Sequence, residues 1–219
     1  AGDGDGIDND PNDPGDGTEN PLCVDAQYSS SWHGTHVGGT VGATTNNTAG
    51  VAGIIWDVEL MDLRVLGCYG GSSYDIQQSI LYAAGLANGS GLVPSQKADV
   101  INMSLGGPGY DAFTESVIAD ARDEGVIVVA ASGNGAGSNY AGSVSYPASY
   151  EGVVSVGATT QSDTRASFST YNEYVDISAP GVGIWSTIGS RDGETFGSGY
   201  AAYNGTSMAT PHVAGVVSL

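Results

Sequence analysis

The segment Gly125-Val-Ile-Val-Val-Ala-Ala131 is the clearest strand in the sequence. Every residue after the glycine is apolar, so both faces of a strand built from this segment would be buried. Strands buried on both faces are typical of parallel sheets, in which helices cover the two sides. The segment therefore predicts a central parallel strand and, with it, an α/β fold.

Shorter apolar runs alternate with helical patterns around this segment. Apolar runs that predict further strands are found at 58–66, 100–104 and 153–158. Helical spacing predicts helices between them, at Ile76, Ile80, Leu81 and Ala84 and again at Phe113, Val117, Ile118 and Ala121. We expect a three-layer α/β domain with a mostly parallel central sheet and helices on both faces. Residues 159–205, rich in Ser, Thr, Gly and Tyr, are expected to run over its surface.

The composition favours one domain and fits either an extracellular or a saline setting. Asp and Glu number 24 against five Lys and Arg, and the resulting charge of −19 would repel nucleic acids and anionic lipid surfaces. No apolar run is long enough to cross a membrane. We therefore treat residues 1–219 as a single domain that opens with an acidic Gly- and Asp-rich loop over 1–20, and we expect neither nucleic-acid nor membrane partners.

Two histidines lie in the segment Ser31-Trp-His-Gly-Thr-His-Val-Gly-Gly-Thr-Val41. On a helix, His33 and His36 would be near neighbours. Such a pair could ligate a metal ion, but the H-E-x-x-H motif of hydrolytic zinc sites also carries a glutamate, and none stands between these two. For the pair taken by itself, the favoured interpretation is that both are ordinary histidines with satisfied ring nitrogens.

Asn134 and Ser207 each stand at a junction between a loop and an ordered element. Asn134 comes just after the strand at 125–131, where an amide can cap a turn or donate a hydrogen bond to an oxyanion. Ser207 falls in the first turn of a helix predicted within 204–219, where serine is most often a cap. The free N–H groups and the positive helix dipole at that position could also stabilise an anionic intermediate.

The motifs His33-Gly-Thr-His-Val37 and Asn204-Gly-Thr-Ser-Met-Ala-Thr-Pro-His-Val-Ala-Gly215 resemble those of the subtilase family of serine peptidases. The resemblance covers nearly all of residues 32–219 and implies a subtilisin-like fold with His33 as general base and Ser207 as nucleophile. It implies that Asn134 and the Ser207 N–H bind the oxyanion and that His36 is a structural neighbour. It also implies two segments that pair with an extended substrate, formed by Gly70, Gly71 and Ser72 and by Ser104, Leu105 and Gly106.

The sequence departs from the family pattern before His33. Subtilases open with an apolar strand that ends in D-[ST]-G, whose aspartate orients the catalytic histidine, and no such strand precedes His33. Asp3, Asp5 and Asp25 follow loop residues, so we assign this role to none of them. We expect the strand, and a propeptide before it, to lie upstream of Ala1. The chain would then be an incomplete catalytic domain, cut at both ends and inactive by itself.

Two features of the sequence leave alternatives open. Four acidic residues near the start offer hard oxygen ligands on a loop, as structural calcium sites do, but an acidic solvated loop has the same pattern; they are Asp3, Asp5, Asp8 and Asp10. Cys23 and Cys68 form either one disulfide or two inert thiols, and the resemblance to a secreted enzyme makes the disulfide plausible. No organic cofactor is expected.

Together these residues predict a secreted serine endopeptidase that cleaves proteins or peptides through an acyl-enzyme. The small residues Gly106, Gly107 and Ala131 suggest a roomy primary pocket and broad specificity. Two alternatives are kept: a non-catalytic peptide-binding domain that lacks the catalytic aspartate, and a metal-dependent hydrolase that uses His33 and His36.

Overall fold

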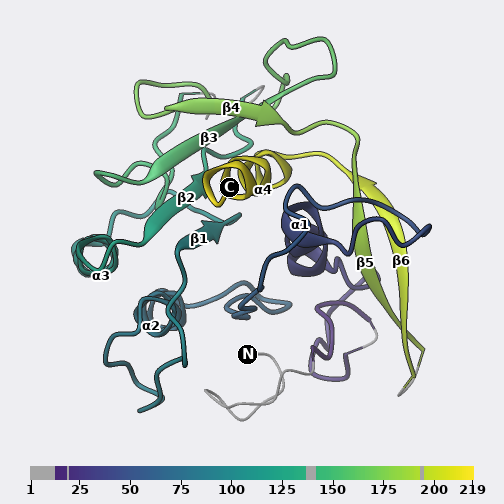
Figure 1. Cartoon of the computed structure of the whole chain (residues 1–219), viewed down its shortest axis with the longest axis horizontal. Coiled ribbons are helices and arrows are strands. Elements are labelled where there is room, and N and C mark those ends of the chain that lie inside the picture. Colours follow the sequence, from purple (N-terminus) through teal and green to yellow (C-terminus); the bar gives the residue numbers. More distant parts are fainter. Residues whose placement is uncertain (1–12, 19, 137–141, 193–194) are drawn as a thin grey trace.

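Four parallel strands form the centre of the structure, a computed structural model that describes residues 13–18, 20–136, 142–192 and 195–219 (Figure 1). They pair in the order β1-β2-β3-β4, with bounds Val100–Met103, Ile127–Ala131, Val154–Thr159 and Ile177–Pro180. The helices are α1 His33–Gly42, α2 Ser73–Ala83, α3 Ala112–Asp123 and α4 Thr206–Val217. A separate antiparallel hairpin consists of β5 Ile184–Asp192 and β6 Thr195–Tyr203. No helix within the described ranges is long and apolar enough to span a membrane.

Strand β2 is buried on both faces, as its sequence predicts. Val128 and Ala130 pack into a core cluster with residues of α2 and α3, whereas Val129 packs into a second cluster with Ala209 and Val213 of α4. The side chains of a strand alternate between its two faces, so these two clusters lie on opposite sides of the sheet. The prediction of three layers with helices on both faces is confirmed.

The carboxyl ends of β1 and β2 lie side by side, because Met103 is the partner of Ala130 in the parallel register. Ser104 follows β1, and the turn that contains Asn134 follows β2. Helix α4 packs against all four strands and brings Ser207, in its first turn, against Ser104. In open α/β sheets, ligand sites gather at this carboxyl edge.

The apolar run at 58–66 was predicted as a strand, and this prediction is wrong. Among the described residues, this run pairs with no strand and carries no strand of its own. Strand structure requires a neighbouring backbone to complete its hydrogen bonds, and an apolar sequence does not supply one. The exposed fractions of Leu60 and Leu63, 45% and 37%, show how much of the apolar surface here remains uncovered.

Residues 159–205 were expected to run over the surface, but they build β4 and the long β5–β6 hairpin. The hairpin pairs from Ile184 opposite Tyr203 to Asp192 opposite Thr195. It packs against α1, and Figure 1 shows it on the side of the molecule away from α2 and α3. The sequence did contain a signal for this hairpin. A Gly-Glu pair separates the two segments, and a two-residue loop with glycine first is typical of tight hairpins.

Cys23 and Cys68 form a disulfide, with their Cα atoms 5.7 Å apart. The bond joins the loop before His33 to the Gly67–Gly70 turn, in which the two glycines pair with each other. A cross-link between residues far apart in sequence restricts the unfolded chain. The disulfide therefore holds two surface loops together beside the amino-terminal end of α1.

A substitution at Gly39 of α1 can test the contact between this helix and the hairpin. A Cβ atom on Gly39 would collide with Thr187 Oγ1 and approach Ser186 Oγ to 2.7 Å, whereas a Cβ on Gly34 of the same helix meets no atom within 4 Å. Gly39→Ala should therefore lower the free energy of unfolding by about 1–3 kcal/mol through overpacking. Gly34→Ala should leave it unchanged or raise it by up to about 1 kcal/mol through helix propensity. Equal urea midpoints for the two variants would contradict this packing.

Candidate active site

Ser207 is held by a reciprocal pair of hydrogen bonds. Its hydroxyl donates to the carbonyl oxygen of Ser104 at 3.2 Å, and the Ser104 hydroxyl donates to the carbonyl oxygen of Ser207 at 2.8 Å. Ser104 directly follows β1, and Ser207 is in the first turn of α4. The pair therefore joins the carboxyl end of a central strand to the start of the helix packed on it.

Pro211 explains why the Ser207 carbonyl is available for this contact. In a regular helix the N–H of residue 211 would donate to the carbonyl of residue 207, but proline has no N–H. Pro211 lies inside α4 and is fully buried. The carbonyl that it leaves without a helical partner receives the Ser104 hydroxyl instead.

Asn134 is oriented by the residue that precedes Ser207. Its side-chain oxygen accepts hydrogen bonds from the N–H of Thr206 at 2.9 Å and from the Thr206 hydroxyl at 3.0 Å. Both bonds use the amide oxygen, so the NH₂ group of this exposed side chain remains available as a donor. The structure thus brings Asn134 next to the start of α4. The role of Thr206 was missed in the sequence because a threonine in a first helical turn is ordinary.

His33 is the first residue of α1. Trp32 before it has left-handed backbone angles, φ 49° and ψ 33°, which are uncommon for a residue with a side chain. A Cβ on Gly189 of the hairpin would lie 2.6 Å from the Trp32 ring, so the absence of a side chain there makes room for the indole. This geometry fixes the direction in which the chain enters the helix.

The pKa of His33 is lowered from its ordinary value of 6.5, chiefly by burial and further by His36, while the charge of Asp16 raises it. Asp16 accepts hydrogen bonds from both the N–H and the hydroxyl of Ser31, at 2.6 and 2.7 Å. Asp16 was not among the residues predicted for the site. A link between residues 15 positions apart in a loop leaves no pattern in the sequence.

Of the two substrate segments predicted from the sequence, one contacts Ser207 and the other leads into α2. Ser104 contacts Ser207 directly, and Leu105 and Gly106 continue from it to Gly107, which pairs with Tyr146. The other segment comprises Gly70, Gly71 and Ser72. It leads into α2, where Ser72 is the N-cap, and its neighbours Cys68 and Tyr69 share a hollow with Asp16 and Ser31.

The Nε2 atom of His36 is not available to the metal pair that the sequence left as an alternative. Its Nε2 atom lies 3.0 Å from the carbonyl oxygen of Ile184 and 3.1 Å from that of Ala201. Carbonyl oxygens only accept, so this nitrogen carries a hydrogen and has no lone pair for a metal. Among the described residues, no group of three or more His, Cys, Asp or Glu side chains could hold a metal ion.

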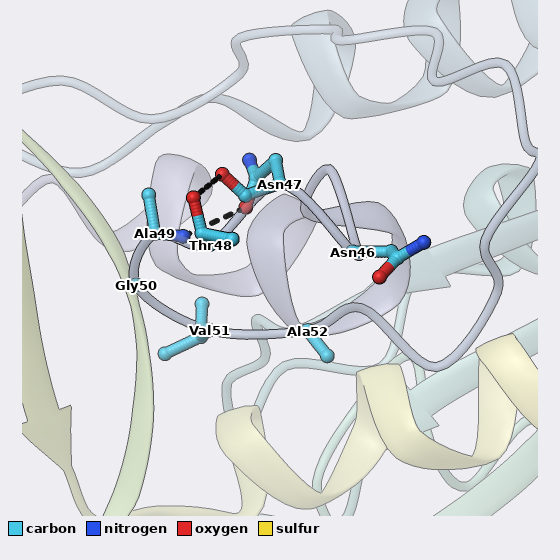
Figure 2. A pocket seen from close by; sticks show the side chains of 7 residues that line it. All are labelled: Asn46, Asn47, Thr48, Ala49, Gly50, Val51 and Ala52. Carbon is cyan, nitrogen blue, oxygen red and sulfur yellow. Dashed lines mark hydrogen bonds between the residues drawn. The ribbon is translucent and has the colours of Figure 1, made fainter.

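The proposed calcium ligands lie outside the described residues; they are Asp3, Asp5, Asp8 and Asp10. A separate shallow hollow follows α1 in the loop from Asn46 to Ala52, shown in Figure 2. The amide oxygen of Asn47 accepts a hydrogen bond from the N–H of Ala49 at 3.1 Å and shapes this loop. The hollow contains none of the site residues predicted from the sequence.

The Ser104 contact can be tested through stability. Ser104→Ala leaves the Ser207 carbonyl without its partner and should lower the free energy of unfolding by about 1 kcal/mol. Pro211→Ala supplies a helical N–H to the same carbonyl, so the double variant should lose about 1 kcal/mol less than the sum of the single variants. Urea unfolding measures all three, with the exposed Ser162→Ala as the control. Additive losses would contradict the role of Pro211.

The electrostatics at His33 can be tested by an NMR titration of the three histidines. The His33 imidazole should lose its proton below pH 6.5, because burial lowers its pKa. Asp16→Asn removes a charge that raises this pKa, so the midpoint should move lower still. Asp163→Asn, which removes an exposed charge outside the set acting on His33, is the control. A midpoint above 6.5, or no response to Asp16→Asn, would contradict this balance of effects.

Comparison with known proteins finds relatives that are named as proteases. Residues 5–219 match the sequence model of the Subtilase family. The chain is 46% identical over its whole length to an extracellular protease of Xanthomonas campestris pv. campestris, of which it covers 38%. It is 47% identical over 85% of its length to Subtilisin Savinase of Lederbergia lenta, of which it covers 62%. The chain thus spans less than two thirds of the length of these relatives.

The fold is also similar to that of a solved structure, described as proteases from Pseudoalteromonas arctica PAMC 21717. The TM-score is 0.87 at 39% sequence identity, and the match covers 99% of this chain and 66% of that one. This match agrees with the parallel sheet and the helices on its two faces. Given the family match over 5–219 and these relatives, the chain belongs to the subtilase family.

Proposed function

We propose that this chain provides the main part of the catalytic domain of a secreted serine endopeptidase. The observation that carries the proposal is the arrangement at the start of α4, where Ser207 is locked to Ser104 and Asn134 is anchored to Thr206. This arrangement puts a hydroxyl, a backbone N–H and a side-chain amide at the positive end of a helix dipole. Two of the relatives carry the printed name "extracellular" protease, which supports secretion.

In the proposed reaction Ser207 attacks the carbonyl carbon of a peptide bond while His33 takes the hydroxyl proton. The resulting oxyanion receives hydrogen bonds from the Asn134 amide and the Ser207 N–H. His33 then returns the proton to the leaving amine, and water hydrolyses the acyl-enzyme by the same steps. In the structure the Ser207 hydroxyl donates to Ser104, so it must turn toward His33 when substrate binds.

The substrate is proposed to lie extended between two backbone segments. Ser104, Leu105 and Gly106 form one edge, next to Ser207, and Gly70 to Ser72 form the other. Backbone pairing with an extended peptide is independent of its side chains, which supports broad specificity. The disulfide between Cys23 and Cys68 would hold the second edge in place.

The proposed mechanism needs a carboxylate that orients His33, and no described residue supplies one. Asp16 acts on His33 electrostatically, but its two oxygens bind the N–H and hydroxyl of Ser31. We propose that an aspartate outside the described residues takes this role. The same observation favours the second candidate function, a peptide-binding domain without catalysis.

Labelling of the full-length protein by a fluorophosphonate probe separates the two functions. The protein should be labelled, Ser207→Ala should abolish labelling, and the exposed Ser162→Ala should leave it intact. Asn134→Ala should lower kcat toward a peptide substrate by about 10²- to 10³-fold, a range already established on another subtilase. A folded, propeptide-free protein that is not labelled would reject the peptidase and leave the peptide-binding domain.

A further inference from the structure

His36 is fully buried and has no part in the proposed reaction. Its Nε2 atom lies between the carbonyl oxygens of Ile184 on β5 and Ala201 on β6, at 3.0 and 3.1 Å. Both oxygens only accept, so Nε2 must carry the hydrogen and the ring bridges the two strands of the hairpin as a donor. The other nitrogen, Nδ1, has no hydrogen-bond partner in the described part of the chain.

The Tyr203 ring stacks on the His36 ring, with centroids 4.3 Å apart and planes 11° from parallel. The Tyr203 hydroxyl donates to the carbonyl oxygen of Ser31 at 2.7 Å. Burial, together with the charge of Asp16, raises the pKa of Tyr203, so this hydroxyl keeps its proton and remains a donor. One tyrosine therefore contacts the chain on both sides of His33.

Two further hydrogen bonds attach the same turn of α1 to β5. The Ser186 hydroxyl donates to the carbonyl oxygen of His36 at 2.7 Å, and the Thr187 hydroxyl donates to that of Thr35 at 2.9 Å. The start of α1 is thus held by the hairpin through both side-chain and backbone groups.

His36 and Tyr203 lie close in sequence to the two proposed catalytic residues. His36 belongs to the first turn of α1, where its N–H donates to the carbonyl of Trp32, the residue before His33. Tyr203 is the last residue of β6, and the chain runs from it through a short turn into Ser207. The stacked pair therefore joins the segment that carries the proposed base to the segment that carries the proposed nucleophile.

We propose that His36 and Tyr203 are positioning residues, which set the placement of His33 relative to Ser207 and thereby the rate of acylation. The inference rests on the proposed peptidase function. His36 acts as a neutral donor to the hairpin, and Tyr203 acts through its stack and its bond to Ser31. Misplacement of reacting groups by about 1 Å can cost roughly 100-fold in rate, so small shifts of this pair are sufficient.

The test uses three variants of the full-length protein. His36→Phe keeps an aromatic ring for the stack and removes the donor to Ile184 and Ala201. Tyr203→Phe keeps the stack and removes only the bond to Ser31, a conservative change that retains the fold if His36→Phe does not. Tyr200→Phe, on an exposed tyrosine of the same strand, is the matched control.

Four quantities are measured for each variant: the rate of fluorophosphonate labelling, the kcat and the KM for a peptide substrate, and the Tm. His36→Phe should lower the labelling rate and kcat by roughly tenfold, and Tyr203→Phe by about threefold, with KM within about twofold of wild type and Tyr200→Phe unchanged. Folded variants that show a lower Tm but a wild-type kcat and labelling rate would reject the positioning role. If the wild type itself is not labelled, the proposed function is rejected, and this inference with it.

Discussion

The interaction on which the rest of the site depends is the reciprocal hydrogen bonding between Ser104 and Ser207. It exists because Pro211 leaves one carbonyl of α4 without a helical donor, and a hydroxyl at the end of β1 takes that place. Leaving a partly buried carbonyl unpaired costs free energy, so this contact stabilises the observed position of the helix start. The nucleophile is therefore proposed to stand where a strand and a helix are joined, not on a free loop.

The other parts of the site follow from this junction. Helix α4 can lie close to the sheet because small residues such as Ala209 and Ala214 face β2 and β3. Thr206, next to Ser207, donates two hydrogen bonds to the Asn134 amide oxygen, so the NH₂ group is available as a donor. These groups are oriented before any substrate is bound, which is how a site stabilises developing charge with little reorganisation. His33 begins α1, which packs against α4 and against β5 of the hairpin, an element outside the central sheet.

Three of the four central strands and the start of α4 could be predicted from sequence because their signals are local, whereas β4 was missed. The apolar run at 125–131 and the glycine turn before Ser207 show their structure in a few consecutive residues. The strand predicted at 58–66 failed because a strand needs a partner, which its own sequence cannot provide. Asp16 and Tyr203 were missed for a related reason: each acts on the His33 segment from a distant part of the chain, through Ser31 in both cases.

The most direct test of the proposed site is a crystal structure of the full-length protein after reaction with a peptidyl phosphonate. Ser207 Oγ should be covalently bonded to phosphorus, with one phosphonate oxygen accepting hydrogen bonds from Asn134 Nδ2 and the Ser207 N–H. The Ser104 hydroxyl should still donate to the Ser207 carbonyl in that structure. A phosphonate bound to another residue, or one whose oxygen meets only solvent while Asn134 points away, would contradict the proposed site.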